Sequence, residues 1–443
     1  MNSQDHYLRC FWGGRAKAVS SGVVIMLGSC WLGIPATLAD DGNYQNFIIG
    51  ERAQGMGGAV GATASGLDAC YYNPAGLARV QDDTLSVSAN LYGFQKFRAT
   101  SGLAVGEDLK RNSFVSIPAA VSGISKLAGE GALAFSAFIP DRSSYNEIST
   151  YLDKQHFYDF SEDDQTLWIG PSFGYPYSDK LLIGASVFGL YRTYSRVENV
   201  SWGDIDYSSS DDLKYNSFGL LAVLGAQYKL DPEWNLGLVL QSPSWNLTGN
   251  GTYSATAVSS VLGSAGYFGD NLNTGSSIPA KVTASIGWAK PKDRAFGLDI
   301  TYHFPSSFNV VSGDLTGVGT TNISASSHLA REAVVDVNLG GEYYLQRMYP
   351  LRLGFFTSRS SAPDVDPTRP DTEYRIPQLN KYGFTASVGR ETKNMATNIG
   401  LIYLFGSGDA YGWILNDQGS VVPARVDAKE QQLYMFLSTS FYF

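Results

Sequence analysis

Charged residues, cysteines and histidines are all scarce in this chain. Only 16% of its 443 residues are charged, and with a net charge of −9 it lacks the basic stripe that nucleic-acid binding requires. Long apolar runs are also missing, because beyond residue 39 no stretch reaches the roughly 18 apolar residues that a membrane-spanning helix needs. The sequence therefore argues against a nucleic-acid-binding protein and against a helical membrane protein.

The few cysteines and histidines exclude further classes. Cys10 and Cys30 lie in the export leader described below, so Cys70 is left alone and no intrachain disulfide is expected. Three histidines remain after the leader: His156, His303 and His328. They are far apart, and no serine or aspartate stands at a spacing that identifies a catalytic triad. We therefore expect no enzymatic activity, no cofactor and no metal site.

The first 39 residues have the features of a signal peptide. Basic residues precede the apolar stretch 19–34, and Thr37-Leu38-Ala39 is a small-x-Ala cleavage pattern. An alternative lipoprotein site ends at Cys30, but the apolar stretch continues past that residue instead of giving way to a polar linker. We expect residues 1–39 to be removed after Ala39 as the chain is exported.

Glycine (48 residues) and tyrosine (27) are abundant, and apolar residues alternate with polar or small ones in about fourteen segments. These predicted strands are 84–97, 112–124, 130–139, 165–175, 180–194, 215–229, 234–247, 278–289, 294–304, 333–345, 351–357, 380–391, 396–405 and 431–443. The connections between them alternate between tight turns and long polar loops, as in bacterial outer-membrane barrels. Residues 84–443 are therefore predicted to form an all-β fold, a transmembrane antiparallel β-barrel of about 14 strands.

The end of the chain supports the barrel. Leu433, Met435, Leu437, Phe441 and Phe443 fall on one face of the last predicted strand. An apolar face that closes on a terminal aromatic residue is typical of a strand whose outer side meets lipid.

Residues 40–83 precede the first predicted strand and are rich in glycine and alanine, with little charge. Small residues let a backbone pack closely in a confined space. A barrel of about fourteen strands encloses an open channel unless something fills it. We expect residues 40–83 to be a hatch inside the lumen; a periplasmic tail that docks elsewhere is the alternative.

Two parts of this segment carry a resemblance. Residues 52–59 (RAQGMGGA) and 68–78 (DACYYNPAGLA) resemble the amino-terminal hatch of the FadL/TodX family, outer-membrane transporters of long-chain fatty acids and other hydrophobic compounds. Further similarities lie at 236–243, 278–282 and 351–356. The resemblance implies a fourteen-stranded barrel plugged by a hatch that includes five residues: Gly57, Gly58, Asn73, Pro74 and Ala75.

The resemblance also implies a function. It predicts passive uptake of a hydrophobic small molecule, held beside the hatch and released sideways through a kink of the third strand, 130–140, where Gly131 and Pro140 permit a bend. Because a related branch of hatch-bearing barrels serves protein secretion, a secretion or assembly partner is the alternative. We expect a monomer in the outer membrane of a Gram-negative bacterium, in contact with its lipid.

Candidate ligand-binding residues come from two places. The predicted strand 180–194 turns apolar residues to both faces, and those opposite its lipid side are Leu182, Phe188 and Leu190. Val258, Val261, Leu262 and Phe268 recur near helical spacing and predict an amphipathic segment in an outer loop, either a capture groove or a lid.

Charged residues give two further hypotheses. Arg192 and Arg352 are candidates for receiving a carboxylate, or alternatively form inward ion pairs with Asp336 or Glu342 that brace the wall. Acidic clusters in the outer loops either bridge lipopolysaccharide through divalent cations or are simply solvated.

Overall fold

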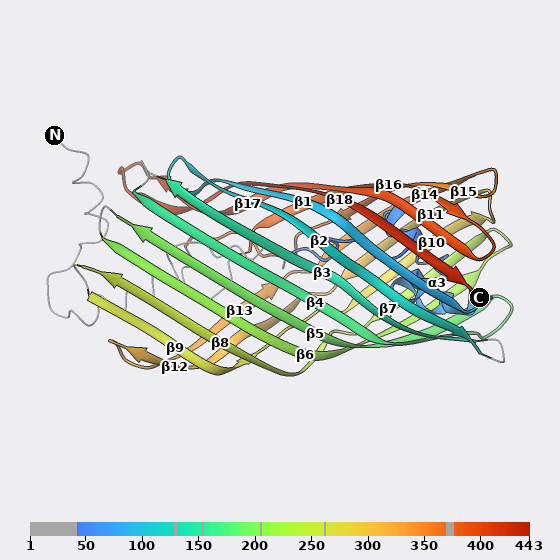
Figure 1. The fold of residues 1–443 in the computed structure, drawn as a ribbon, viewed down its shortest axis with the longest axis horizontal. Helices are drawn as coiled ribbons and strands as arrows, with labels where there is room; N and C mark the ends of the chain where they lie inside the picture. The colour runs from blue at the N-terminus through green and yellow to red at the C-terminus, as the bar shows by residue number, and fades with distance from the viewer. Residues whose placement is uncertain (1–41, 128–130, 152–154, 204–205, 261–262, 369–375) are drawn as a thin grey trace.

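The computed structural model describes residues 42–127, 131–151, 155–203, 206–260, 263–368 and 376–443 (Figure 1). The predicted signal peptide, residues 1–39, lies outside this range. Among the described residues, no helix is long and apolar enough to cross a membrane.

Fourteen strands form a closed antiparallel barrel (Figure 1), which confirms the predicted fold class. The ring closes where β1 (Thr84–Ala104) pairs with β18 (Val421–Tyr442). Between them the ring runs, in order, through β2 (Glu107–Lys126), β3 (Ala132–Tyr151), β4 (His156–Pro176), β5 (Leu181–Trp202), β6 (Tyr207–Lys229), β7 (Trp234–Gln241), β10 (Lys281–Lys290), β11 (Arg294–His303), β14 (Val334–Leu345), β15 (Tyr349–Ser358), β16 (Gln378–Glu391) and β17 (Met395–Leu415).

Four additional strands lengthen one part of the wall. β8 (Trp245–Ser259) pairs with the far half of β6, and the sheet continues through β9 (Gly263–Thr274), β12 (Ser306–Val318) and β13 (Ile323–Arg331). Most segments that the sequence predicts as long polar loops are therefore strand. Their backbone pairing continues beyond the apolar belt, where the outward face turns polar and the apolar alternation that marks a strand disappears.

The two faces of β5 and β18 differ as predicted. In β5, Ile183, Val187 and Tyr191 are 38–49% exposed and point outward, whereas the side chains that alternate with them are buried. In β18, Leu433, Leu437 and Phe441 are exposed, and the alternating Gln432 to Ser440 set faces inward. A continuous outward apolar surface is what a sheet surrounded by hydrocarbon requires.

The segment before β1 lies inside the barrel. It contains α2 (Arg52–Gly55), α3 (Gly66–Tyr72) and η2 (Pro74–Arg79), most of whose residues are buried. Figure 1 shows this segment in blue within the wall, toward the end of the barrel that carries the C terminus. We call residues 42–80 the inner segment; that it is a separate hatch domain remains a prediction.

Candidate functional site

Glycines of the barrel wall lie where the wall contacts the inner segment. Eight neighbouring strands of the ring, from β4 round to β15, each contribute one glycine at which an added Cβ would lie within 2.7 Å of the inner segment. These residues, the glycine row, are Gly174, Gly184, Gly225, Gly237, Gly287, Gly297, Gly340 and Gly354. At these eight positions the wall carries no side chain, so its backbone comes close to the inner segment.

Asn73 joins the inner segment to this part of the wall. Its side-chain amide donates to the carbonyl oxygens of Gly61 (2.8 Å) and of Ala226 in β6 (3.0 Å), while its side-chain oxygen accepts from the Ala75 amide (3.2 Å). Pro74 occupies the first turn of η2, where its missing N–H costs nothing. Asn73 thus caps η2 and fixes it against the wall.

Gly57 and Gly58 allow a sharp turn after α2. Both have a positive φ, 61° and 82°, which side-chain-bearing residues rarely adopt. A Cβ on Gly57 would also lie 2.9 Å from the amide nitrogen of Phe355 in β15. All five residues that the resemblance assigns to the hatch lie in the inner segment.

We expect replacement of Gly184 by valine to dislodge the inner segment. An added Cβ would lie 2.3 Å from the carbonyl carbon of Pro74, and overpacking of this kind costs about 1–3 kcal/mol or more. Limited proteolysis of the purified protein should then release the inner segment faster than in the wild type. Gly123→Val is the matched control, because a Cβ at Gly123 meets open space; equal protease resistance in both variants would contradict the expectation.

Both arginines proposed as carboxylate receptors are already in ion pairs. Arg352 Nε lies 2.5 Å from Glu342, and its Nη2 lies 3.0 Å from Glu391. Arg192 pairs with Asp164 on the neighbouring strand, rather than with Asp336 or Glu342. Both arginines therefore form ion pairs within the wall, which is the alternative hypothesis from the sequence. The partner of Arg192 is Asp164 on the adjacent strand β4, and not Asp336 or Glu342.

The inner segment adds charges to this network. Arg52 Nε lies 3.0 Å from Glu342, and Glu51 accepts hydrogen bonds from Asn398 and Ser440 on the wall. Burial raises the pKa of Glu51 to about 7, although the hydrogen bond from Ser440 and the charge of Arg352 oppose the shift. These contacts hold the inner segment against β14, β17 and β18.

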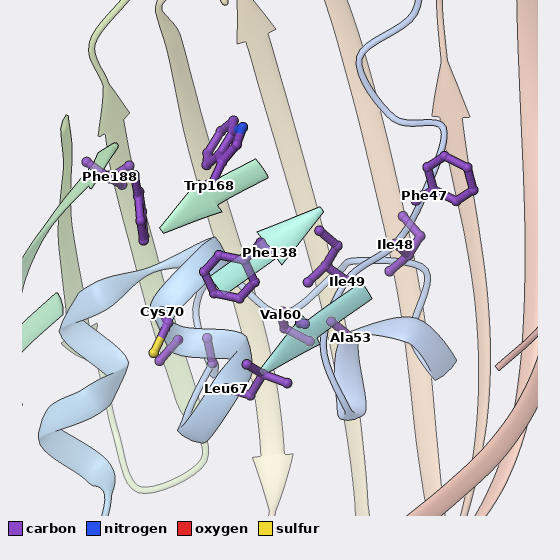
Figure 2. Close-up of a cluster of buried hydrophobic side chains, with 14 of the residues drawn as sticks. Phe47, Ile48, Ile49, Ala53, Val60, Leu67, Cys70, Phe138, Trp168 and Phe188 are labelled. Atoms are coloured by element: carbon purple, nitrogen blue, oxygen red, sulfur yellow. The ribbon is translucent and has the colours of Figure 1, made fainter. Parts of the chain in front are cut away.

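An aromatic group lies between the inner segment and strands β3 to β5. The ring of Tyr71 in α3 lies 5.4 Å from that of Phe138 and 5.7 Å from that of Trp168, and Phe188 lies 5.8 Å from both of these wall residues. We call these four residues the aromatic group. Figure 2 shows Phe138, Trp168 and Phe188 on the barrel strands beside the helices of the inner segment.

The predicted ligand residues on β5 face this region. Phe188 and Leu190 belong to the same buried cluster as the aromatic group, whereas Leu182 is buried outside it. Trp168 is 4% exposed, and its indole N–H has no hydrogen-bond partner among the described residues. A buried donor without a partner, in an apolar cluster, is available to a polar atom of a ligand.

The predicted amphipathic segment in the outer loop is wrong. Residues 245–259 and 263–274 form the paired strands β8 and β9, and Tyr253, Ala255 and Ala257 are buried at period two. Val258 and Phe268 point outward, 52% and 49% exposed, so they do not form one face of a helix. Val261 and Leu262 lie outside the described residues. The small residues there satisfy a helical spacing and a strand spacing equally, and pairing with β6 selects the strand.

The wall is irregular beside the aromatic group. The pairing of β3 with β4 shifts register between Phe138 and Asp141, across Pro140. The pairing of β4 with β5 is interrupted between Ile169 and Ser172, across Pro171. Proline has no N–H to donate to a neighbouring strand, so both breaks fall where the sequence weakens the sheet.

Comparison with known proteins extends only to the fold. No family model matches the chain, and no curated protein matches it in sequence. Among solved structures, the toluene transporter TodX of Pseudomonas putida matches at a TM-score of 0.66 with 15% identity, over 90% of this chain and 99% of that one. A FadL homologue of Pseudomonas aeruginosa matches at 0.60 with 14% identity, over 90% and 100%. The toluene transporter TbuX of Ralstonia pickettii matches at 0.59 with 16% identity, over 90% and 99%.

These matches cover 90% of this chain and nearly the whole of each solved structure. The resemblance expected from the sequence is confirmed at the level of the fold: this chain has the fold of the toluene transporters TodX and TbuX and of the FadL homologue.

Proposed function

We propose that the protein takes up a hydrophobic small molecule across the outer membrane by passive diffusion. The observation that carries this proposal is the aromatic group, an apolar cluster inside a barrel whose lumen also holds the inner segment. A pore for ions or sugars needs a wet, polar lumen and has no use for such a cluster. The structural relatives include two toluene transporters and a FadL homologue, which supports the same class of substrate.

The proposed exit is sideways, through the wall. The aromatic group adjoins the pairing irregularities between β3 and β4 and between β4 and β5, and a hydrophobic molecule that leaves there enters the hydrocarbon of the membrane directly. The inner segment closes the route along the barrel axis in this scheme. No covalent step and no cofactor takes part.

The proposal also covers the cellular location and the oligomeric state of the protein. The apolar outward belt suits the outer membrane of a Gram-negative bacterium, in which the chain is a monomer in contact with lipid. The acidic residues of the outer strands are a weak basis for contact with lipopolysaccharide, because several of them, Asp163 and Asp211 among them, already pair with arginines of this chain.

A secretion or assembly partner is the second candidate, and one experiment separates the two. Native mass spectrometry of the protein, purified from cells in a detergent shorter than any plausible ligand, should reveal a bound fatty acid, hydrocarbon or aromatic compound. An affinity pull-down from the same cells should recover no stoichiometric protein. An empty lumen together with a stoichiometric protein partner would overturn the uptake proposal and support the second candidate.

A further inference from the structure

Four basic residues lie together on the outward face of the wall, on three neighbouring strands. Arg98 of β1 stands directly opposite Lys429 of β18 on one side and opposite Lys110 of β2 on the other. Lys96 lies two residues before Arg98 on the same face of β1, and all four residues are exposed. Neighbouring strands are about 4.8 Å apart, so the three strands place these side chains in a patch about 10 Å wide. We call the four residues the basic row.

The basic row has little counter-charge. Arg98 Nε donates to Asp108 Oδ2 at 2.8 Å, but the three lysines of the row make no ion pair among the described residues. Two more carboxylates lie farther from the apolar belt, where Asp409 is paired with Arg425 and Asp427 is exposed. The row therefore keeps a surplus of positive charge.

This arrangement differs from the rest of the outward face. Lys214 of β6 lies 2.7 Å from Asp212, and Arg142 of β3 lies 3.6 Å from Asp163. Each of these exposed cations has its own carboxylate. The lysines of the basic row are therefore available to an anion that the chain itself does not supply.

The basic row lies at one edge of the apolar belt. Next to it, Phe94 of β1 and Phe114 of β2 point outward, 55% and 59% exposed, with their ring centroids 4.9 Å apart. β1 begins at the end of the barrel that carries the C terminus (Figure 1). From Leu85 to Lys96, a strand tilted by about 45° rises about 25 Å, which is the height of the apolar band of outer-membrane barrels. The row thus lies at the far edge of the belt, away from the short turns.

Cations beside an exposed apolar surface match a lipid with an anionic head group. The outer leaflet of the outer membrane consists of lipopolysaccharide, whose phosphate groups are carried by the same sugars as its acyl chains. We propose that the basic row binds a phosphate group of lipopolysaccharide, while the acyl chains lie against Phe94 and Phe114. The inference rests on the proposed outer-membrane location. It adds a lipid site on the outside of the barrel, separate from the ligand in the lumen.

The test measures binding of purified lipopolysaccharide to the full-length protein in a neutral detergent. A chelator is present, so that no divalent cation bridges the lipid to acidic residues. The variant Lys96→Gln, Lys110→Gln, Lys429→Gln should bind roughly a hundredfold more weakly than the wild type, because each lysine near an anionic lipid contributes about a factor of five. The wild type should bind dephosphorylated lipopolysaccharide about tenfold more weakly or worse, since the charge that the row recognises is then missing.

The control variant is Lys126→Gln, Lys180→Gln, Lys393→Gln, which removes three exposed lysines at the end with the short turns and should leave binding unchanged. Equal binding by the wild type and the basic-row variant would overturn the inference. Equal binding of lipopolysaccharide before and after dephosphorylation would do the same, and this comparison decides the matter if the variant does not assemble, because it needs only the wild type.

Two further measurements separate this inference from the proposals on which it stands. Phosphatidylglycerol that binds as tightly as lipopolysaccharide, with the same dependence on the lysines, would overturn the assignment to lipopolysaccharide. Recovery of the protein outside the outer-membrane fraction of cells would overturn the proposed location and this inference with it. Uptake of a hydrophobic probe is measured in the same cells, so normal uptake without lipopolysaccharide binding would overturn this inference alone.

Discussion

Removal of the inner segment, residues 42–80, should convert a closed protein into an open channel. The intact protein, reconstituted in planar bilayers, is expected to conduct few ions. The inner segment lies inside the barrel and comes close to eight neighbouring strands at the glycine row. A fourteen-stranded barrel without it encloses water, so the deletion variant should show large, stable conductance steps.

The comparison needs a folded barrel. Heat-modifiable migration of the variant on a gel establishes that the wall has closed. Asn73→Ala is an informative intermediate, since it removes one hydrogen bond to the wall, one within the inner segment and the cap of η2 while leaving the segment in the chain; it should give rare, transient openings. Identical conductance of the intact and deleted forms would show that the segment does not block the pore.

Replacement of both Phe188 and Leu190 by aspartate should abolish uptake. Both side chains are buried in the cluster that contains the aromatic group, 0% and 6% exposed. An unpaired carboxylate in an apolar cluster costs several kcal/mol and draws in water, which no apolar ligand displaces favourably. Cells that depend on the protein for import of a radiolabelled hydrophobic probe should lose at least about nine-tenths of the uptake. A tenfold loss corresponds to only about 1.4 kcal/mol of ligand binding free energy.

The matched control places the same charges on the outer hairpin. Val258→Asp with Phe268→Asp changes two outward residues of β8 and β9 that are about half exposed, and uptake should be unchanged. Both double variants must reach the membrane as folded barrels. Normal uptake by a folded Phe188→Asp, Leu190→Asp protein would show that the ligand does not pass β5.

The sequence predicts the strands of the barrel ring wherever their outer face meets lipid. In that part of the barrel the outward face of each strand must be apolar, whereas the inward face can be polar. β5 and β18 therefore show alternating apolar residues in their sequence, and their outward and inward faces are predicted correctly. Beyond the apolar belt that constraint ends. β8, β9, β12 and β13 are held by pairing with neighbours, which is a long-range property, and the sequence offers no local sign of it.

The site is predicted only in part, for the same reason. Phe188 and Leu190 are visible as apolar residues on the inner face of a strand, and Asn73-Pro74-Ala75 through its resemblance to a known hatch. Tyr71, Phe138 and Trp168 lie on three elements far apart in the chain, so nothing local connects them.

The glycine row also constrains the order in which the protein assembles. The inner segment precedes β1 in the chain, and the ring closes where β1 meets β18, the two strands farthest apart in sequence. Contacts between such distant residues form slowly, because a long loop must be ordered before they form. Backbone contacts as close as those at Gly184 and Gly354 leave no clearance for threading a folded segment into a finished cylinder. We therefore expect the inner segment to be in place before β1 pairs with β18. It would then act as a template on which the strands of the barrel assemble.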